Sequence, residues 1–285
     1  MKKKVTIIII LTGWVLIFML FFNEKKIKYD EVLLYESNEG AIDVIFEENQ
    51  PIAGDFLPGY LKISDDKYIT YKDSGSGEYS IVNYENGKEI RTVLVNEIHS
   101  QLRYNSATNS VFYLDDGNVK KMDVISGNVT DITSVSYGEN DSFYVSSDEQ
   151  YVFFIDKGIE NKLLRKNIST EELYVIDEDV LIFDASTNGK IIYQKTASQK
   201  FGIYLYDDMN KRIEKIFADS ERSNDIAISK DGKKFLYTRH KSYWFYDNGK
   251  DCLHCYNLST KKDAVVYETK SNSQIDYLSF LDFSK

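Results

Sequence analysis

Apolar and polar residues alternate in short runs along most of the chain, and one arrangement of them recurs. A small polar residue precedes a turn built on Asp, Asn or Glu, and a short apolar strand ending in aromatic residues follows. The copies occupy residues 63–71, 107–113, 147–154, 186–193 and 229–237. Aligned on Asp66, Asn109, Glu149, Asn188 and Asp231, they are 43, 40, 39 and 43 residues apart. A period of this size predicts one propeller blade per copy.

Each copy predicts a unit of four antiparallel strands. In the third unit we expect strands at residues 142–146, 151–155, 162–168 and 172–176. A second recurring turn separates the last two strands of each unit, at Asn86-Gly87, Ser126-Gly127, Ser169-Thr170, Met209-Asn210 and Ser259-Thr260. Short β-rich runs between such turn residues are typical of an antiparallel meander.

Strand-like segments remain at both ends of the five units. Ile275 to Leu281 resembles the first strand of a further unit, and Glu31 to Tyr35 with Ala41 to Phe46 could supply its other strands. Joining the two ends in one blade closes a ring and removes an open sheet edge. The predicted fold is therefore all-β, a six-bladed β-propeller of four-stranded antiparallel blades. Five blades with a loose N-terminal hairpin, or seven with degenerate blades, are the alternatives.

The phrase from Ile228 to Tyr237, with the strand and turn at Tyr256 to Thr260, resembles the repeat of TolB-like six-bladed β-propellers. The resemblance covers nearly everything after residue 26, and it implies a fold rather than an activity. A proline commonly follows the serine in that family, whereas this chain has Asp65, Asp148, Thr187 and Lys230 there. The chain also lacks room for the α/β domain that precedes the propeller in TolB, so the partners of TolB are not carried over.

The N-terminus has the pattern of a membrane anchor. Three lysines, Lys2 to Lys4, precede a low-polarity run of 18 residues from Val5 to Phe22. As a helix this run would span roughly 27 Å, close to the hydrocarbon thickness of a bilayer. It ends in the bulky series Ile17 to Phe22 rather than the small residues that a signal peptidase requires, so we expect an uncleaved signal anchor.

The expected organisation is an anchor with cytoplasmic lysines at residues 1–26 and one propeller domain at residues 27–285. A long C-terminal domain translocates largely regardless of its charge, which favours a cytoplasmic N-terminus and an extracytoplasmic propeller in a single-pass membrane protein. The alternative is a cytoplasmic domain tethered by its N-terminus.

The charge of the propeller region excludes one class of partner. Removing five lysines and Glu24 from the totals of 35 basic and 45 acidic residues leaves 30 and 44 from residue 27 onward, a net charge near −14. A field of that sign repels nucleic-acid phosphates, so no nucleic acid is expected as a partner.

Motifs for catalysis or metal binding are mostly missing. No serine has the glycine spacing of a nucleophile elbow, and none of His99, His240 or His254 opens an HExxH motif, so no cofactor or metal is expected. Cys252 and Cys255 are three apart in a predicted strand, where their side chains should point to opposite faces. We interpret them as small buried apolar residues.

Pairs of acidic residues are the main candidates for catalysis in this sequence. Asp115-Asp116 and Asp207-Asp208 lie in predicted turns, and the favoured interpretation is that they are solvated. Carboxylates that converge at the channel mouth would instead indicate a propeller hydrolase or lyase acting on a glycan or peptide.

One irregular repeat gives the candidate binding site. The turn-to-turn interval from Asn210 to Thr260 is 50 residues, against 40, 43 and 40 in the earlier units, and the excess falls within Arg239 to Lys250. Insertions in a repeat often mark the binding face, and aromatic side chains are enriched at interaction hot spots. The predicted partner-binding residues are His240, Tyr243, Trp244, Phe245 and Tyr246. The alternative is an extended hairpin that packs on its own blade.

These features together predict a membrane-anchored extracytoplasmic β-propeller without catalysis. It would act as a binding or scaffold module for a protein, a peptide or an envelope component.

Overall fold

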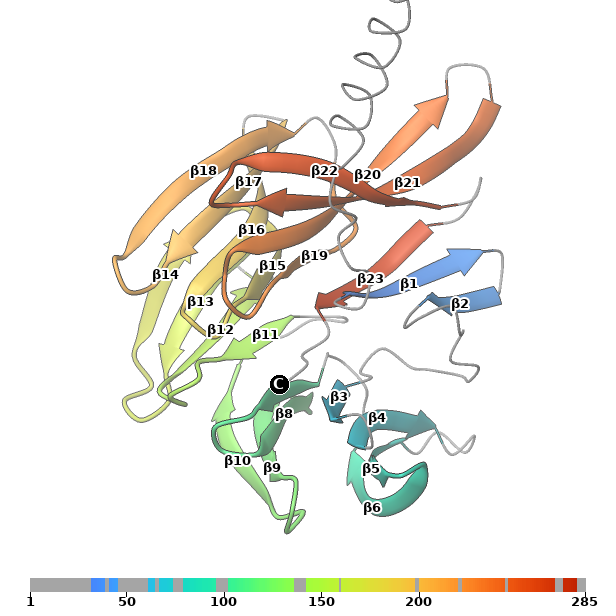
Figure 1. The fold of residues 1–285 in the computed structure, drawn as a ribbon. Helices are drawn as coiled ribbons and strands as arrows, with labels where there is room; N and C mark the ends of the chain where they lie inside the picture. Colours follow the sequence, from blue (N-terminus) through green and yellow to red (C-terminus); the bar gives the residue numbers. More distant parts are fainter. Residues whose placement is uncertain are drawn as a thin grey trace, which may run out of the picture.

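The structure is a computed structural model, and it describes residues 32–38, 41–45, 61–64, 67–73, 79–95, 102–135, 142–158, 160–197, 200–219, 222–243, 246–269 and 274–280. Within these ranges the regular secondary structure is entirely β-strand (Figure 1). No helix in these ranges is long and apolar enough to cross a membrane. The predicted anchor, Val5 to Phe22, lies outside them.

Five sheets of four antiparallel strands form consecutive blades, each with its strands in chain order. Blade 1 contains β3 (Leu61–Ser64), β4 (Lys67–Asp73), β5 (Tyr79–Glu85) and β6 (Lys88–Val95). Blade 2 contains β7 (Arg103–Asn105), β8 (Ser110–Asp115), β9 (Asn118–Asp123) and β10 (Val129–Ser134). Blade 3 contains β11 (Phe143–Val145), β12 (Tyr151–Asp156), β13 (Lys162–Asn167) and β14 (Leu173–Asp177). Blade 4 contains β15 (Val180–Ala185), β16 (Lys190–Ala197), β17 (Lys200–Asp207) and β18 (Arg212–Asp219). Blade 5 contains β19 (Ile226–Ile228), β20 (Lys234–Tyr243), β21 (Tyr246–Asn257) and β22 (Lys262–Glu268).

The two ends of the chain meet in a sixth sheet, which we call the closing sheet. Its strand order is β2 (Ala41–Ile45), β1 (Val32–Asn38) and β23 (Gln274–Phe280). Strand β1 pairs with β23 from Val32 opposite Phe280 to Ser37 opposite Gln274. The predicted pairing of the two ends is therefore confirmed, but the prediction of six four-stranded blades is wrong for the described residues. Two strands come from the N-terminal side and one from the C-terminal side, which leaves this sheet with three.

The first strand of each blade lies innermost. Contacts join β3 to β7, β11 to β15, β15 to β19 and β19 to β23, so the first strands of successive sheets follow one another around a common axis. The fourth strand of each blade is consequently the outer edge. This is the arrangement of a propeller, in which each blade buries both faces against its neighbours.

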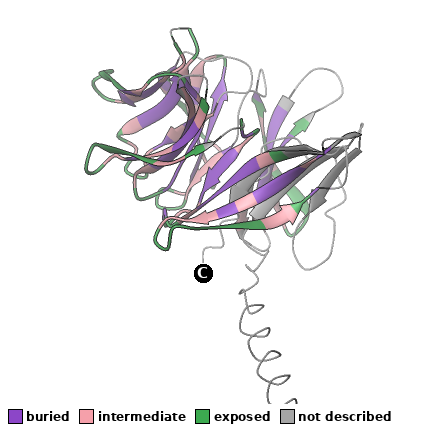
Figure 2. Cartoon of the chain, turned by 90° about the horizontal axis from the view of Figure 1, so that it is seen from above, coloured by how far each residue is buried: buried purple, intermediate pink, exposed green. Residues whose placement is uncertain are grey.

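The core lies between the blades. Blades 3 and 4 enclose Phe153, Leu163, Phe183, Ile191 and Tyr193, each at most 2% exposed. Figure 2 shows buried residues along the middle of the strands and exposed residues at the turns. Because burying one such side chain contributes roughly 1.5–3 kcal/mol, the faces between blades supply most of the stabilisation.

The recurring polar phrase forms a closed turn between the first and second strands. The backbone N–H of Ser186 donates to Lys190 O at 2.8 Å, and the Ser186 Oγ donates to Asn188 Oδ1 at 2.6 Å. Ser229 closes the corresponding turn of blade 5 by donating from its N–H to Lys234 O at 2.9 Å and from its Oγ to Asp231 Oδ1 at 2.8 Å.

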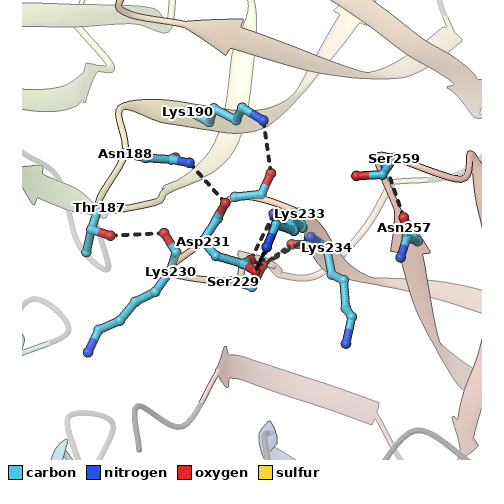
Figure 3. Close-up of polar contacts among 11 residues, drawn as sticks. Thr187, Asn188, Lys190, Ser229, Lys230, Asp231, Lys233, Lys234, Asn257 and Ser259 are labelled. Carbon is cyan, nitrogen blue, oxygen red and sulfur yellow. Dashed lines mark hydrogen bonds and ion pairs between the residues drawn. The ribbon is translucent and has the colours of Figure 1, made fainter. Parts of the chain in front are cut away.

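These turns also join neighbouring blades (Figure 3). The Ser147 Oγ donates to Thr187 O at 3.2 Å, and the Thr187 Oγ1 donates to Lys230 O at 3.0 Å. Asn188 Nδ2 donates to Asp231 O at 2.9 Å. The small polar residues that mark the repeat in the sequence thus tie blades 3, 4 and 5 together.

The alignment of the repeats needs one correction. Three positions share a positive φ and an N–H that bonds to the serine carbonyl of the turn: Glu149 (φ 57°), Gly189 (φ 79°) and Gly232 (φ 60°). Glu149, Gly189 and Gly232 are separated by 40 and 43 residues. The sequence pattern had aligned Glu149 with Asn188 and Asp231, which lie one residue before Gly189 and Gly232. The serine of the blade 3 turn is Ser146, whereas the copy read from the sequence began at Ser147, which accounts for the offset of one residue.

The outer strand of each of the five blades carries a bulge. In each of the five blades the pairing of the third and fourth strands skips one residue of the fourth. The skipped residues are all β-branched and apolar: Ile90, Ile132, Ile176, Ile216 and Val266. A bulge re-aims a side chain, and three of them, Ile132, Ile176 and Ile216, pack against the clusters between blades.

Candidate functional site

The extra length of blade 5 lies in a long hairpin. Strands β20 and β21 have 10 and 12 residues, and they pair from Lys234 opposite Asn257 to Tyr243 opposite Tyr246. Figure 1 shows this hairpin extending beyond the neighbouring strands. The insertion seen in the sequence therefore lengthens the ladder instead of forming a separate loop.

The predicted aromatic residues lie at the end of this hairpin. The backbones of Tyr243 and Tyr246 face each other in the ladder, while Trp244 and Phe245 lie outside the described residues. Neither their contacts nor the binding prediction is tested by the structure. His240 is the one predicted site residue whose side chain is described.

His240 is oriented by a buried carboxylate. Its Nδ1 lies 2.9 Å from Asp251 Oδ1, and the side chains are 51% and 1% exposed, respectively. Because a carboxylate only accepts hydrogen bonds, Nδ1 is the donor in this contact. The Nε2 and Cε1 atoms of the imidazole also lie against Gly249, where a Cβ would overlap them.

The Asp251 carboxylate belongs to a polar network at the base of the hairpin. Its Oδ2 accepts a hydrogen bond from Asn224 Nδ2 at 3.1 Å. Its backbone N–H donates to Thr269 Oγ1 at 3.0 Å, and the Thr269 N–H donates to Asp251 O at 2.9 Å. The network therefore joins Asp251 of β21 to Asn224, which precedes β19, and to Thr269, which follows β22. Sequence reasoning missed Asp251, although an acid across a predicted hairpin from a histidine is a usable signal.

The innermost strands hold a second cluster, which spans four blades. Arg103 of β7 reaches Asp184 of β15 with its Nη1 2.9 Å from Oδ1, and the side chains are 20% and 11% exposed. Asp184 Oδ2 accepts the backbone N–H of Ile228 in β19 at 2.8 Å. Tyr144 of β11, between them, donates its hydroxyl to Ser186 O at 3.1 Å.

The electrostatics of this cluster follow from burial. Desolvation raises the pKa of Tyr144 well above its usual value, and Arg103 opposes that shift. Tyr144 therefore stays a neutral hydrogen-bond donor. Both oxygens of Asp184 face positively polarised groups, so the cluster is an ion pair that joins blades 2, 4 and 5.

The acidic pairs are less solvated than the sequence indicated. Asp115 is 3% exposed and lies 2.8 Å from Lys120 Nζ. Asp208 Oδ1 accepts hydrogen bonds from Arg165 of the neighbouring blade at 3.0 Å and from Tyr206 at 3.1 Å. The interpretation as solvated turns is wrong for these two carboxylates, because contacts from other strands accompany burial of Asp115 and leave Asp208 only 19% exposed.

The cysteines are buried in β21, and each is 5% exposed. Cys252 lies opposite Arg239 and Cys255 opposite Leu236 in the ladder. In the part of the chain that the structure describes, no group of three or more His, Cys, Asp or Glu side chains is placed to hold a metal ion.

Comparison with solved structures identifies the fold. TolB from Acinetobacter baumannii aligns with a TM-score of 0.62 at 12% identity, over 88% of this chain and 66% of that one. A putative TolB from Agrobacterium tumefaciens aligns with a TM-score of 0.56 at 8% identity, over 89% of this chain and 99% of that one. A protein from Lactobacillus plantarum gives 0.56 at 9% identity, over 88% and 99%. This chain thus spans about two thirds of the Acinetobacter TolB structure.

No protein-family model and no curated protein sequence matches the chain. The likeness to TolB structures therefore rests on the arrangement of the strands. It confirms the expected TolB-like propeller as a fold, and identities this low show nothing beyond the fold.

Proposed function

We propose that this chain is a membrane-anchored, extracytoplasmic propeller that binds a protein, a peptide or an envelope component without chemistry of its own. The observation that carries the proposal is the long β20–β21 hairpin of 10 and 12 residues, with four consecutive aromatic residues at its end. His240 and the buried Asp251 join the two strands where the inserted residues lie. Aromatic side chains are amphipathic and suited to binding a partner surface, and four of them follow one another in this part of the sequence.

The closing sheet acts in this proposal as a sixth blade. Its β23 contacts β19 of blade 5, and its β1 and β2 come from the N-terminal side of the chain. The N-terminal anchor would thus precede, by the nine residues 23–31, the strand that pairs with β23.

The alternative function, a hydrolase or lyase using channel carboxylates, needs an acid that is available for proton transfer. Asp184 is the acid among the described side chains of the innermost strands, and it is engaged by Arg103 and by the Ile228 N–H. Both oxygens of this carboxylate are thus engaged within the propeller, which leaves neither placed to exchange a proton with a substrate. This favours the binding module.

Replacing Trp244 and Tyr246 with alanine should weaken partner binding while leaving the fold intact. Loss of hot-spot aromatics typically costs about 2 kcal/mol or more of binding free energy, roughly a 30-fold weaker Kd. Exposed substitutions usually change stability by about 0.5 kcal/mol or less. The partner would first be isolated by crosslinking and affinity capture from membranes with the wild-type protein, and then titrated against both proteins.

A matched control is Met209→Ala, because Met209 is 82% exposed in the turn between β17 and β18 of blade 4. It should leave binding unchanged. A large drop in melting temperature for the double variant would contradict the proposal and assign these rings to the blade core. Capture of no partner by wild-type protein would also contradict it.

The topology is tested with an epitope tag after Lys285. In intact cells or spheroplasts, added protease should remove the tag while a cytoplasmic marker protein survives. The reason is that Val5 to Phe22 is retained as the anchor and the propeller lies outside. A tag that is cleaved only after membrane lysis would place the propeller in the cytoplasm.

A further inference from the structure

The outer strand of blade 3 has an unusual surface. Three consecutive residues of β14 are large, apolar and exposed: Leu173 (55%), Tyr174 (46%) and Val175 (44%). The strand lies at the end of its sheet, and in the described part of the chain no further strand pairs with its outer side (Figure 1). Its outward N–H and C=O groups therefore form an accessible edge beside exposed apolar side chains.

The other outer strands are protected by charge. Each has at least one charged residue within its first four positions: Lys88, Glu89 and Arg91 in β6, Asp131 in β10, Arg212, Glu214 and Lys215 in β18, and Lys262 and Asp263 in β22. Charges on an edge strand prevent unwanted strand pairing. In β14 the first four positions are Leu173 to Ile176, without a charge. All five strands share the bulge, so the difference lies in the side chains.

The edge of β14 is well supported. Tyr174 lies opposite Arg165 of β13, whose guanidinium is 5.1 Å from the Tyr174 ring and 4.6 Å from the Tyr151 ring. Beyond the bulge, Ile176 is buried at 8% exposure. These contacts hold Leu173 to Val175 as a regular segment, so an added strand would meet a preformed template at low ordering cost.

Acidic residues flank this apolar segment on both sides. Glu171 and Glu172 precede it, Glu178 and Asp179 follow it, and all four are exposed. Lys166 pairs with Glu171, and Lys162 lies 3.2 Å from Glu178, so two of the four carboxylates have a basic neighbour. The remaining negative charge favours a partner with basic residues outside an apolar centre.

A second copy of this chain fits poorly. Antiparallel pairing of two β14 strands about Tyr174 would place Glu171 of one copy opposite Asp177 of the other. Like charges directly opposite each other destabilise a strand pair. The charge pattern thus points to a different chain.

We propose that the outer edge of β14 binds an extended peptide segment as a fifth strand of blade 3. The segment would have alternating apolar residues at its centre and Lys or Arg on both sides. Backbone hydrogen bonds to β14 would supply affinity, while Leu173, Val175 and the acidic flanks would supply selectivity. This surface lies on a different blade from the hairpin, so it is tested separately from the proposed function.

The probes are three fluorescent peptides, titrated by anisotropy into the full chain. The first alternates valine and threonine over four residues, with two lysines at each end. The second replaces its lysines with glutamates, and the third keeps the lysines but replaces both threonines with prolines. Binding of the first at least about tenfold more tightly than either other peptide is the expected result, since only it offers both strand hydrogen bonds and charge complementarity.

The variants are Leu173→Lys with Val175→Lys, Glu172→Lys alone, and Val265→Lys as a matched control, because Val265 is 51% exposed on the outer strand of blade 5. The double variant should weaken binding of the first peptide at least about tenfold, and E172K about two- to fivefold. V265K should change the Kd of the first peptide by less than about twofold. Melting curves check that each variant is folded.

Four results would overturn the proposal: no binding of the first peptide, equal binding of all three peptides, loss of binding in V265K equal to that in the double variant, or unchanged binding in both the double variant and E172K. Sedimentation of the wild-type chain supplies a further check. A dimer that the double variant dissociates would show that a second copy covers this edge, which would also overturn the proposal.

Discussion

Deletion of residues 275–285 is expected to convert a cooperatively folded propeller into an aggregating protein. The deletion removes nearly all of β23, the strand that pairs with β1 from Val32 to Ser37 and contacts β19 of blade 5. Strand β1 would then expose an open edge, and β19 would lose its packing against β23. A typical domain has a free energy of unfolding of about 5–15 kcal/mol, and we expect the deletion to lower it by a large fraction.

The measurement is the soluble fraction after expression, followed by thermal denaturation of whatever is soluble. The matched control deletes only residues 281–285, which follow the last residue of β23. It should leave solubility and melting temperature close to those of the wild type. If the longer deletion melts like the full chain, β23 does not close the ring.

Replacing Asp184 with alanine should be the most damaging single substitution at the channel. It removes the partner of Arg103 and the acceptor of the Ile228 N–H, and so leaves a largely buried cation and an unsatisfied amide. Breaking a buried ion pair typically costs about 3–5 kcal/mol. At about 2–4 °C per kcal/mol for a domain of this size, a loss of 3 kcal/mol lowers the melting temperature by about 6–12 °C.

The control for Asp184→Ala is Glu85→Ala. Glu85 pairs with Lys67 at 3.1 Å, but both side chains are exposed, at 37% and 41%. Loss of this exposed ion pair should lower the free energy of unfolding by less than about 1 kcal/mol. A double variant that also carries Arg103→Met should be more stable than the two single effects predict, because it removes the uncompensated cation. A melting temperature of D184A equal to that of E85A would show that the ion pair contributes nothing.

Strands and turns were largely readable from local sequence. In the third unit the predicted strands at 151–155 and 162–168 agree with β12 (Tyr151–Asp156) and β13 (Lys162–Asn167) to within one residue at each end. The recurring Asn86-Gly87 pair has positive φ at both residues, as a tight hairpin turn requires. These features depend on residues that are close in the chain, so a single sequence carries the signal.

The bulge of the outer strands was readable but overlooked. A β-branched apolar residue recurs at Ile90, Ile132, Ile176, Ile216 and Val266, once per unit. An apolar residue that breaks the alternation of a strand predicts a bulge that turns it back to the core, as Ile132, Ile176 and Ile216 show, whereas Ile90 is 51% exposed.

The repeated four-stranded unit, the pairing of the two chain ends and the extra length of blade 5 could be predicted from the sequence, because alternation and turn residues act locally. Which polar side chains meet became clear only in the folded chain. Arg103 and Asp184 are 81 residues apart, and Asp208 looks like a solvated turn residue until Arg165 of the next blade reaches it. Such contacts depend on the rotation of one blade relative to the next, and that rotation is set by packing across whole faces, which no local pattern encodes.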